Sequence, residues 1–327
     1  KYQVPSTKYP PSMDVSSLNP RSRIAESASS LFSHASYPLE HSLDYPRDPG
    51  LFGPDSVTWQ VVGDAAAFIG GIRALLIQAA HPEVVAGVVE HSTYETDPLG
   101  RLSRTSAYVA ATSYGAMPEV EAVLEVVNRA HTGIVGTSHR GRSYSANSPR
   151  YAAWVHNALA DSFLTAYESF GPRPLDPPDH DRYVQEQARL GARFQTEDLP
   201  TTRNDLAAWI ADHPDIGPSP GMEQVVAFLA DPPLPRSASG PYAVLFQAAI
   251  TTIPDRIATI LGVRRRLGAH PCGSVLTRTL RWALGASPSW WLALERTATP
   301  LPKGVAFRRP PPIVGVEQRF AASLRGR

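Results

Sequence analysis

The stretch from Val57 to Ala80 is apolar on nearly every side, and it constrains the fold more than any other feature of the sequence. At 3.6 residues per turn, its branched and aromatic side chains fall on all faces of a helix instead of on one stripe. A helix without a polar face must lie at the centre of a protein, covered by other helices. Its most apolar part, from Ala65 to Ala80, carries Arg73 and Gln78. This part is shorter than the ~20 apolar residues that a bilayer crossing needs. We therefore expect a buried core helix.

Prolines divide the rest of the chain into helical segments. They make up 32 of 327 residues, about twice the usual share of ~5%, and they cluster between segments of helical periodicity. Runs of alternating β-branched residues are missing, so no strand is predicted. We expect an all-α fold, with an N-terminal arm and loop over residues 1–50 that includes a helix over 21–35. A single large helical domain over 51–327 follows, and its Pro- and Arg-rich end is expected to pack against the body.

Composition excludes several classes of partner. Thirty-one basic against thirty acidic residues give a net charge of +1, so nucleic acid is not an expected partner, and no segment predicts a stable membrane span. A single cysteine, Cys272, excludes an intrachain disulfide, and without a visible secretory signal it favours a cytoplasmic location. Because the chain starts at Lys1 rather than at Met, export by a removed leader is an open alternative. The sequence does not indicate the oligomeric state.

The segment from Pro118 to Gly136 places His131 on the apolar face of a helix. Steps of three and four residues connect it to the other members of that face, which are Val120, Leu124, Val127 and Ile134. A core-facing imidazole must find a hydrogen-bond partner, ionise or bind a metal, because leaving it unpaired costs roughly 1–3 kcal/mol. By itself the pattern leaves two interpretations open, a hydrogen-bonded core histidine and a metal ligand.

A helix expected from Pro98 to about Tyr114 has an unusual polar side. Arg101, Arg104 and Thr105 share that side, at three- and four-residue spacing. Arginines usually lie on an exposed face, but the opposite side of this helix is only weakly apolar. The helix could therefore direct these polar groups inward, toward a ligand.

Two adjacent glycines interrupt the apolar helix. Gly70 and Gly71 each cost ~1 kcal/mol in a helix relative to alanine. Their presence indicates either close packing against another helix or the approach of something flat or bulky to the backbone.

The motifs of the best-known enzyme classes are missing. The ten histidines form no HExxH or zinc-finger spacing and no Glu-x-x-His pair of a di-iron bundle. GxGxxG, Walker and GxSxG motifs are also missing. The segment GAHPCGS places Cys272 as in the thiolate loop of cytochromes P450, with Glu186 and Arg189 as an upstream ExxR pair. The aromatic-Gly-x-Gly that precedes that loop is missing and the chain is too short for that fold, so haem-thiolate ligation is a minor alternative.

Ordered blocks of sequence between about residues 50 and 205 resemble the DUF2236 family, the catalytic domain of MpaB-like and rubber (latex-clearing) oxygenases. These blocks are DPGLFGPDSVTW, GGIRALLIQAAHPEVVAGVVEHS, DPLGRLSRT, VNRAHTGIVG and YSANSPRYAAWVH. Their number and their order make the resemblance specific. It implies an all-helical protein that holds haem b in its core.

The resemblance also assigns roles to single residues. His131 matches the histidine of an H-x-x-V segment that ligates the haem iron on the proximal side. Arg101, Arg104 and Thr105 match an R-x-x-K/R-T motif on the distal side, and Glu90 lies in the region of a glutamate proposed as the base. The rubber oxygenases have an iron-coordinating lysine at the position of Arg104. Because a guanidinium is not a metal ligand, the distal side is expected to hold water, dioxygen or nothing, which argues against polyisoprene as the substrate.

Four further residues are expected to contact the cofactor. Gly70 and Gly71 would let the flat macrocycle approach the central helix, and Arg140 and Arg142 could pair with its propionate carboxylates. The expected function is that of a haem b-dependent oxygenase, which activates dioxygen or peroxide to oxidise a small apolar substrate. The alternatives are a peroxidase-like haem enzyme, a haem-binding or haem-sensing protein without catalysis, and a helical binding protein without haem.

Overall fold

Prolines and capping side chains determine where the helices of this protein begin. Pro98 and Pro149 occupy the first turns of two long helices, where a missing N–H costs no hydrogen bond. The Ser56 hydroxyl accepts a hydrogen bond from the backbone N–H of Trp59, and the Asp97 carboxylate accepts one from Gly100. The prediction of helices separated by prolines is confirmed.

The computed structural model describes residues 19–32, 39–196 and 199–300. Its first elements are α1 (Pro20–Ser30), η2 (Ser42–Asp44), α2 (Val57–Val62), α3 (Ala67–Ala79), α4 (Pro82–His91), α5 (Pro98–Tyr114) and α6 (Met117–His131). A hairpin of β1 (Val135–Thr137) and β2 (Ser143–Ser145) is followed by α7 (Pro149–Phe170), α8 (Pro177–Gly191) and η3 (Ala192–Phe194). The last elements are α9 (Arg203–Ala211), α10 (Pro220–Ala230), α11 (Arg236–Thr251), α12 (Asp255–Leu261), α13 (Ala269–Leu284) and α14 (Pro288–Arg296).

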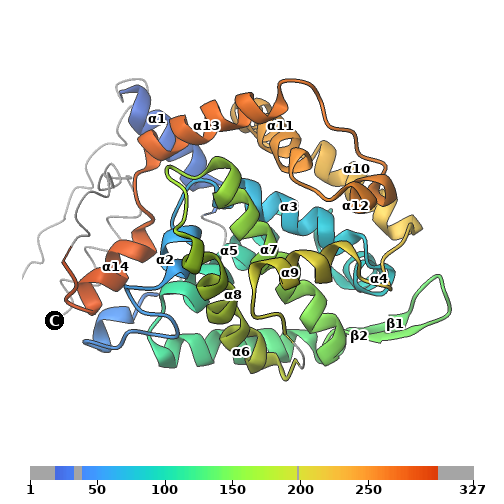
Figure 1. The fold of residues 1–327 in the computed structure, drawn as a ribbon, viewed down its shortest axis with the longest axis horizontal. Coiled ribbons are helices and arrows are strands. Elements are labelled where there is room, and N and C mark those ends of the chain that lie inside the picture. The colour runs from blue at the N-terminus through green and yellow to red at the C-terminus, as the bar shows by residue number, and fades with distance from the viewer. Residues whose placement is uncertain (1–18, 33–38, 197–198, 301–327) are drawn as a thin grey trace, which may run out of the picture.

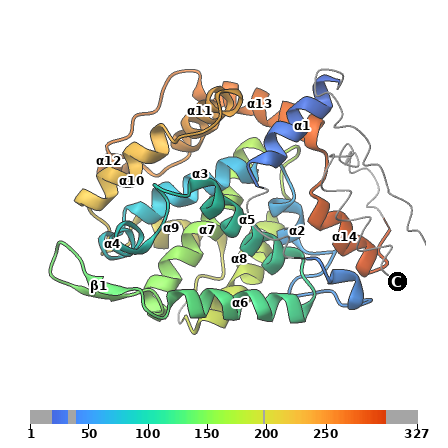
Figure 2. The same cartoon turned by 180° about the vertical axis from the view of Figure 1, so that it is seen from behind.

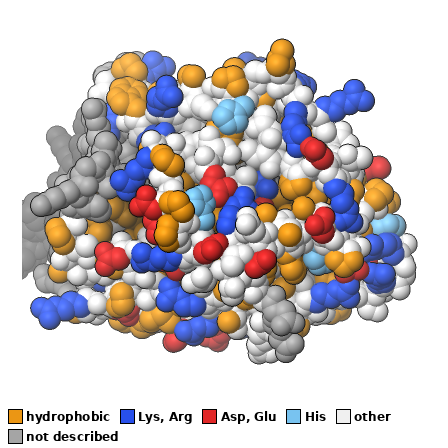
Figure 3. Space-filling model, in the orientation of Figure 1, with side chains coloured by type: hydrophobic (Ala, Val, Ile, Leu, Met, Phe, Trp, Pro, Cys, Tyr) orange, Lys and Arg blue, Asp and Glu red, His pale blue; other side chains and the backbone are white. Residues whose placement is uncertain are grey.

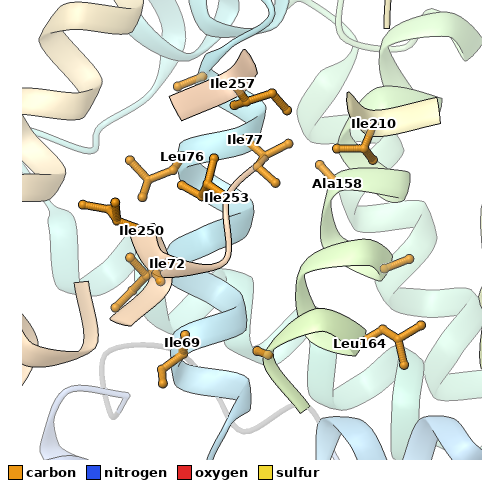
Figure 4. Close-up of a cluster of buried hydrophobic side chains, with 14 of the residues drawn as sticks. Ile69, Ile72, Leu76, Ile77, Ala158, Leu164, Ile210, Ile250, Ile253 and Ile257 are labelled. Carbon is orange, nitrogen blue, oxygen red and sulfur yellow. The ribbon is translucent and has the colours of Figure 1, made fainter. Parts of the chain in front are cut away.

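The central position of α3 is confirmed, and α4, α7, α10, α11 and α12 pack around it (Figure 1). Its buried side chains, including Ile69 and Leu76, meet apolar side chains from the surrounding helices. Figure 4 shows Leu164 of α7, Ile210 of α9 and Ile250 of α11 in the same cluster. The absence of a polar face on α3 is therefore matched by helices on all sides.

The continuous helix predicted over residues 57–80 is wrong, because the structure divides it into α2 and α3. The division lies at Asp64, whose carboxylate accepts a hydrogen bond from the backbone of Ala66. The same carboxylate binds Nε and a terminal nitrogen of Arg281, on α13, at 2.6 and 2.7 Å. A two-pronged ion pair of this kind is strong when it is shielded from water. It joins the start of α3 to a helix more than 200 residues later.

The contact between α3 and α7 explains one of the two glycines. A Cβ on Gly70 would lie 2.8 Å from the ring of Phe163 and 3.2 Å from the backbone oxygen of Ser162. One turn later, Arg73 is buried and donates to the Asp161 carboxylate at 2.6 Å and to the Ser162 hydroxyl at 2.8 Å. By contrast, nothing lies within 4 Å of a Cβ on Gly71. Close helix packing therefore accounts for Gly70 but not for Gly71.

The polar segment after α6 forms a short antiparallel hairpin, so the prediction that no strand would form is wrong here. Val135 pairs with Ser145 and Thr137 with Ser143, and Gly141 adopts a positive φ of 73° in the connection. The hairpin projects from the helical body (Figures 1 and 2). Strands of three residues are too short to show an alternating pattern, which is why the sequence did not indicate them.

The predicted N-terminal region contains a helix that packs on the body. α1 is shorter than the expected helix over 21–35 and contacts α13. The rest of the predicted arm, residues 1–18, and the Pro- and Arg-rich segment after residue 300 lie outside the described residues. No single helix in the described ranges is long and apolar enough to cross a membrane. Taken together, α3 and α4 are long and apolar enough, but the two helices are bent by 105° relative to each other.

The two adjacent glycines provide a matched pair of substitutions. We expect Gly70→Ala to lower the free energy of unfolding by about 1–3 kcal/mol, because the new methyl group overpacks the α3–α7 contact. Gly71→Ala should leave the stability unchanged or raise it by up to ~1 kcal/mol, because alanine is the better helix former. Urea unfolding of the two variants checks this. Equal destabilisation by both would contradict the packing described here.

Candidate functional site

His131 is the last residue of α6, a helix that runs along one edge of the molecule (Figure 1). Only the first half of its apolar face is deeply covered: Val120 and Leu124 pack with Leu190 of α8. The His131 side chain is half-buried, so the expectation of a fully core-facing imidazole is only partly met. It has no hydrogen-bond partner among the described residues. Burial lowers its pKa, so the imidazole is neutral at pH 7 and keeps a lone pair available for a ligand.

The residues after His131 lie against α4. A Cβ on Gly87 would meet the side chains of Ile134 and Tyr144 at 3.6 and 3.3 Å. The Tyr144 hydroxyl donates a hydrogen bond to the carboxylate of Glu90, at the end of α4. Burial and this hydrogen bond raise the pKa of Tyr144, so the phenol stays a donor. Gly136 lies against the pair, because a Cβ there would come within 2.5 Å of the Tyr144 oxygen.

The arginines of α5 are bound to the loop between α4 and α5. Arg101 is partly buried; it donates to the Ser92 hydroxyl and stacks on the Tyr94 ring, 5.9 Å from its centre. Arg104 is exposed and donates to the Asp97 carboxylate at 3.1 Å and to the hydroxyl of Thr93 at 3.2 Å. The expectation that this side of the helix faces inward is therefore met by Arg101 but not by Arg104.

Thr105 is also exposed, and its hydroxyl makes no hydrogen bond within the described ranges. The fold thus places Glu90 and His131 on segments that touch, with Arg101 and Arg104 attached to the loop that follows Glu90. α4, the hairpin and the C-terminal end of α6 lie at one end of the molecule, at the left of Figure 2. Among the described residues, no hydrogen bond or ion pair joins His131 to Arg101, Arg104 or Thr105. The helices α5 and α6 pack on each other, so the two sides of the predicted site lie on neighbouring helices.

Arg140 and Arg142, predicted to bind propionates, have carboxylate partners within the protein. Arg140 donates to both oxygens of the buried Glu83 and to the backbone oxygen of Asp215. Arg142 donates to the Asp215 carboxylate at 2.7 Å, and Arg150 donates to its other oxygen. Burial alone would raise the pKa of Asp215, but these hydrogen bonds outweigh it and lower that pKa to about 2. The two arginines therefore belong to a second cluster, which they form with Glu83, Arg150 and Asp215. That they bind the propionates of a cofactor stays a prediction.

The centre of this second cluster is His81, which sequence analysis did not single out. Its side chain is 0% exposed, and neither ring nitrogen has a hydrogen-bond partner within the described part of the chain. The rings of Tyr151, Trp154 and His213 surround it, with centres 5.4, 5.6 and 5.6 Å away. In the sequence His81 only marks the end of the apolar helix, and no motif connects it to a loop 132 positions later. The three-dimensional structure is needed to find this cluster.

A polar hollow of about 460 Å³ lies elsewhere, between α3, α7, α9 and the junction of α11 and α12. Arg73, Arg203 and Arg265 line it, and each is paired with an aspartate. None of the predicted site residues borders this hollow. The size of a pocket alone therefore does not identify the site.

Two residues of the thiolate-loop pattern, Glu186 and Cys272, lie on different helices, α8 and α13. Cys272 is exposed in the first turn of α13. Glu186 instead accepts hydrogen bonds from the backbone N–H groups of Val57 and Thr58, at the start of α2. Glu186 therefore has a structural role, whereas Cys272 is an exposed thiol.

Another buried histidine makes the stability depend on pH. Burial lowers the pKa of His156 from 6.5 to about 4, and its Nε2 has no partner. The unfolded chain therefore binds the proton first, and stability present above pH 6.5 is lost as the pH falls toward 4. At about 1.4 kcal/mol per pKa unit, His156 contributes up to roughly 3 kcal/mol to this loss. Urea unfolding at several pH values should show a smaller loss in His156→Leu. The exposed His139→Leu is the control, and equal pH dependence in all three proteins would contradict this assignment.

The family comparison covers most of the chain. The ER-bound oxygenase mpaB/B′/rubber oxygenase catalytic domain matches residues 59–285, which extends past residue 205 to the end of α13. The matched region contains Glu90, Arg101, Arg104, Thr105 and His131. Neither the curated proteins nor the solved structures include a significant match. Because the match covers well over half of the sequence, the chain belongs to the mpaB and rubber oxygenase catalytic-domain family, a family of oxygenases.

Proposed function

We propose that this protein is a haem b-dependent oxygenase in which His131 binds the iron. The observation that carries the proposal is the half-buried imidazole of His131, which has no hydrogen-bond partner among the described residues. The resemblance to the family assigns the role of proximal ligand to this histidine. A half-buried imidazole of this kind either hydrogen-bonds to water or binds a ligand. Membership of an oxygenase family favours the ligand.

The residues around His131 fit a haem in two respects. The imidazole is neutral at pH 7, which is the form that binds iron. The side chains of His131, Arg104 and Thr105 are all at least partly accessible, so an added ligand could reach each of them. Gly71 would let the macrocycle approach α3, since nothing lies within 4 Å of a Cβ built on this residue. When bound, haem would supply the activation of dioxygen or peroxide.

The chain's own residues would position the reactants and hold charge. Arg101 and Arg104 carry positive charge, and Thr105 offers an unused hydroxyl, so this side of the site suits an anionic or oxygen-bearing ligand. The network of Ser92, Tyr94 and Asp97 holds the guanidiniums and limits their reach. No lysine is present at the position of Arg104, so the protein offers no amine ligand from this position.

Glu90 is the proposed base of the site. Its carboxylate is half exposed, and Tyr144 donates to one of its oxygens. The other oxygen can then accept a proton from a substrate or from water. Because Tyr144 is buried and held by its packing on Gly136, it fixes the direction of the Glu90 carboxylate.

Arg140 and Arg142 could bind propionates only by giving up Glu83 and Asp215, so the proposal does not depend on them. We propose a small apolar substrate, because binding pockets for small molecules are lined mainly by apolar side chains. A peroxidase-like activity is the second candidate, and turnover with peroxide but not with dioxygen would favour it.

We also propose a cytoplasmic location.

Replacing His131 tests the iron ligand. We expect wild-type protein to bind haem with a Soret band, and His131→Ala to lose that band or to shift it strongly, because the axial ligand is gone. The exposed His139→Ala should keep the wild-type spectrum. An unchanged Soret band in His131→Ala would remove His131 from the site, and a thiolate-type carbonyl spectrum would assign the ligand to Cys272.

Replacing Arg104 tests the distal side. Arg104→Lys introduces an amine that can coordinate iron, as the lysine of the rubber oxygenases does. We expect the ferric spectrum to change to that of a six-coordinate, low-spin haem. Arg104→Gln has no amine and should keep the wild-type coordination. If Arg104→Lys and Arg104→Gln gave the same spectrum, Arg104 would not lie opposite His131.

A further inference from the structure

Three side chains of the second cluster bring possible metal-ligand atoms close together. One atom each from His81, His213 and Asp215 lie within 4.8 Å of one another. His81 directly precedes α4, and the other two belong to the loop between α9 and α10. The two imidazole centres are 5.6 Å apart. Two imidazoles that share one ion at N–metal distances of about 2.0–2.1 Å have centres roughly 5 Å apart, so a small movement would complete the geometry.

His81 is the side chain that requires an explanation. It is 0% exposed, and in residues 19–32, 39–196 and 199–300 neither of its ring nitrogens finds a hydrogen-bond partner. Glu83 Oε2 lies 3.3 Å from Nδ1 but without hydrogen-bond geometry. Buried polar atoms without partners are rare in folded proteins. We propose that His81, His213 and Asp215 bind a divalent transition-metal ion.

The surroundings supply the outer contacts that metal ligands usually have. An imidazole bound to a metal commonly directs its other nitrogen at a carboxylate. Glu83 Oε2 lies 3.3 Å from Nδ1 of His81, so a small rotation of the ring would direct Nδ1–H at this carboxylate. The Asp215 carboxylate is held by Arg142 and Arg150. Each of its oxygens keeps a second lone pair for an ion. His213 Nδ1 accepts only a long hydrogen bond, at 3.3 Å, from the backbone N–H of Asp215. Turning this ring toward an ion would therefore break only a weak hydrogen bond.

The charges in the cluster select the kind of ion. The guanidiniums of Arg140, Arg142 and Arg150 outnumber the carboxylates of Glu83 and Asp215. This excess of positive charge disfavours a hard cation such as Ca²⁺ or Mg²⁺, which is held mainly by charge and oxygen ligands. Arg142 and Arg150 have 54% and 55% of their side chains exposed, so water screens them. Ions with a strong preference for imidazole, such as Zn²⁺, Co²⁺ or Fe²⁺, bind the set of two histidines and one carboxylate. The expected occupant is an ion of this class.

Such an ion would join three parts of the fold. It would connect the end of α3 and start of α4 with the α9–α10 loop, which also binds the backbone of Ala80 through Gly217. Through Arg140 and Arg142 it would hold the hairpin as well. The site shares no proposed ligand with the haem site, so each can be present without the other.

The test is metal binding by the full chain, with any affinity tag removed. Zn²⁺ is titrated by calorimetry, and Co²⁺ is followed by its visible absorption. We expect one equivalent of Zn²⁺ per chain and an intense Co²⁺ band typical of a four-coordinate site. His213→Ala and Asp215→Asn should each weaken Zn²⁺ binding by at least about 100-fold, since loss of even an outer contact costs 10–100-fold. The exposed His139→Ala should bind as wild type does.

Circular dichroism shows whether each variant is folded, and Asp215→Asn keeps the shape of the side chain if His213→Ala does not fold. Wild-type protein that binds neither ion would overturn the proposal and would point to water around His81. Equal Zn²⁺ affinity in Asp215→Asn and wild type would overturn it too. The haem content of the same samples is measured separately, so failure here is distinguishable from failure of the haem assignment.

Discussion

The close contact between α3 and α7 is the constraint on which the rest of the structure depends. A hydrogen atom at Gly70 lets the two backbones approach, and the buried pair of Arg73 and Asp161 fixes them side by side one turn later. Removing one member of such a pair would leave a buried charge, which typically costs about 3–5 kcal/mol. With α7 in place on one side, α4, α10, α11 and α12 cover the remaining faces of α3. An apolar helix that cannot face water is thereby enclosed.

Features that depend on local sequence could be predicted, and those that depend on distant partners could not. The central helix, the proline-capped helices and the helix of His131 follow from periodicity and capping over a few turns. The break at Asp64 could not be predicted, because its cause is Arg281 on α13. The same holds for the site. Arg101 and Arg104 were found by spacing and resemblance, whereas their partners in the α4–α5 loop, and the whole cluster around His81, needed the fold.

The hairpin connects the two candidate sites. It begins directly after His131, its Tyr144 holds Glu90, and Arg140 and Arg142 bind Glu83 and Asp215. The strands themselves contribute only a few backbone bonds, and a two-stranded hairpin alone is marginal in water. Its position is therefore set mainly by these side-chain contacts at both ends of α4. A change at either site can reach the other through this segment, because α4 carries Glu83 in its first turn and Glu90 in its last.

The place of α6 at the edge of the molecule has a consequence for assembly. The main apolar cluster, built around α3, contains no residue of α6, and the cluster that does include α6 residues is small. The main core is thus complete without any contribution from α6. If His131 holds haem as proposed, the macrocycle would be attached at the rim of a scaffold whose core does not depend on it.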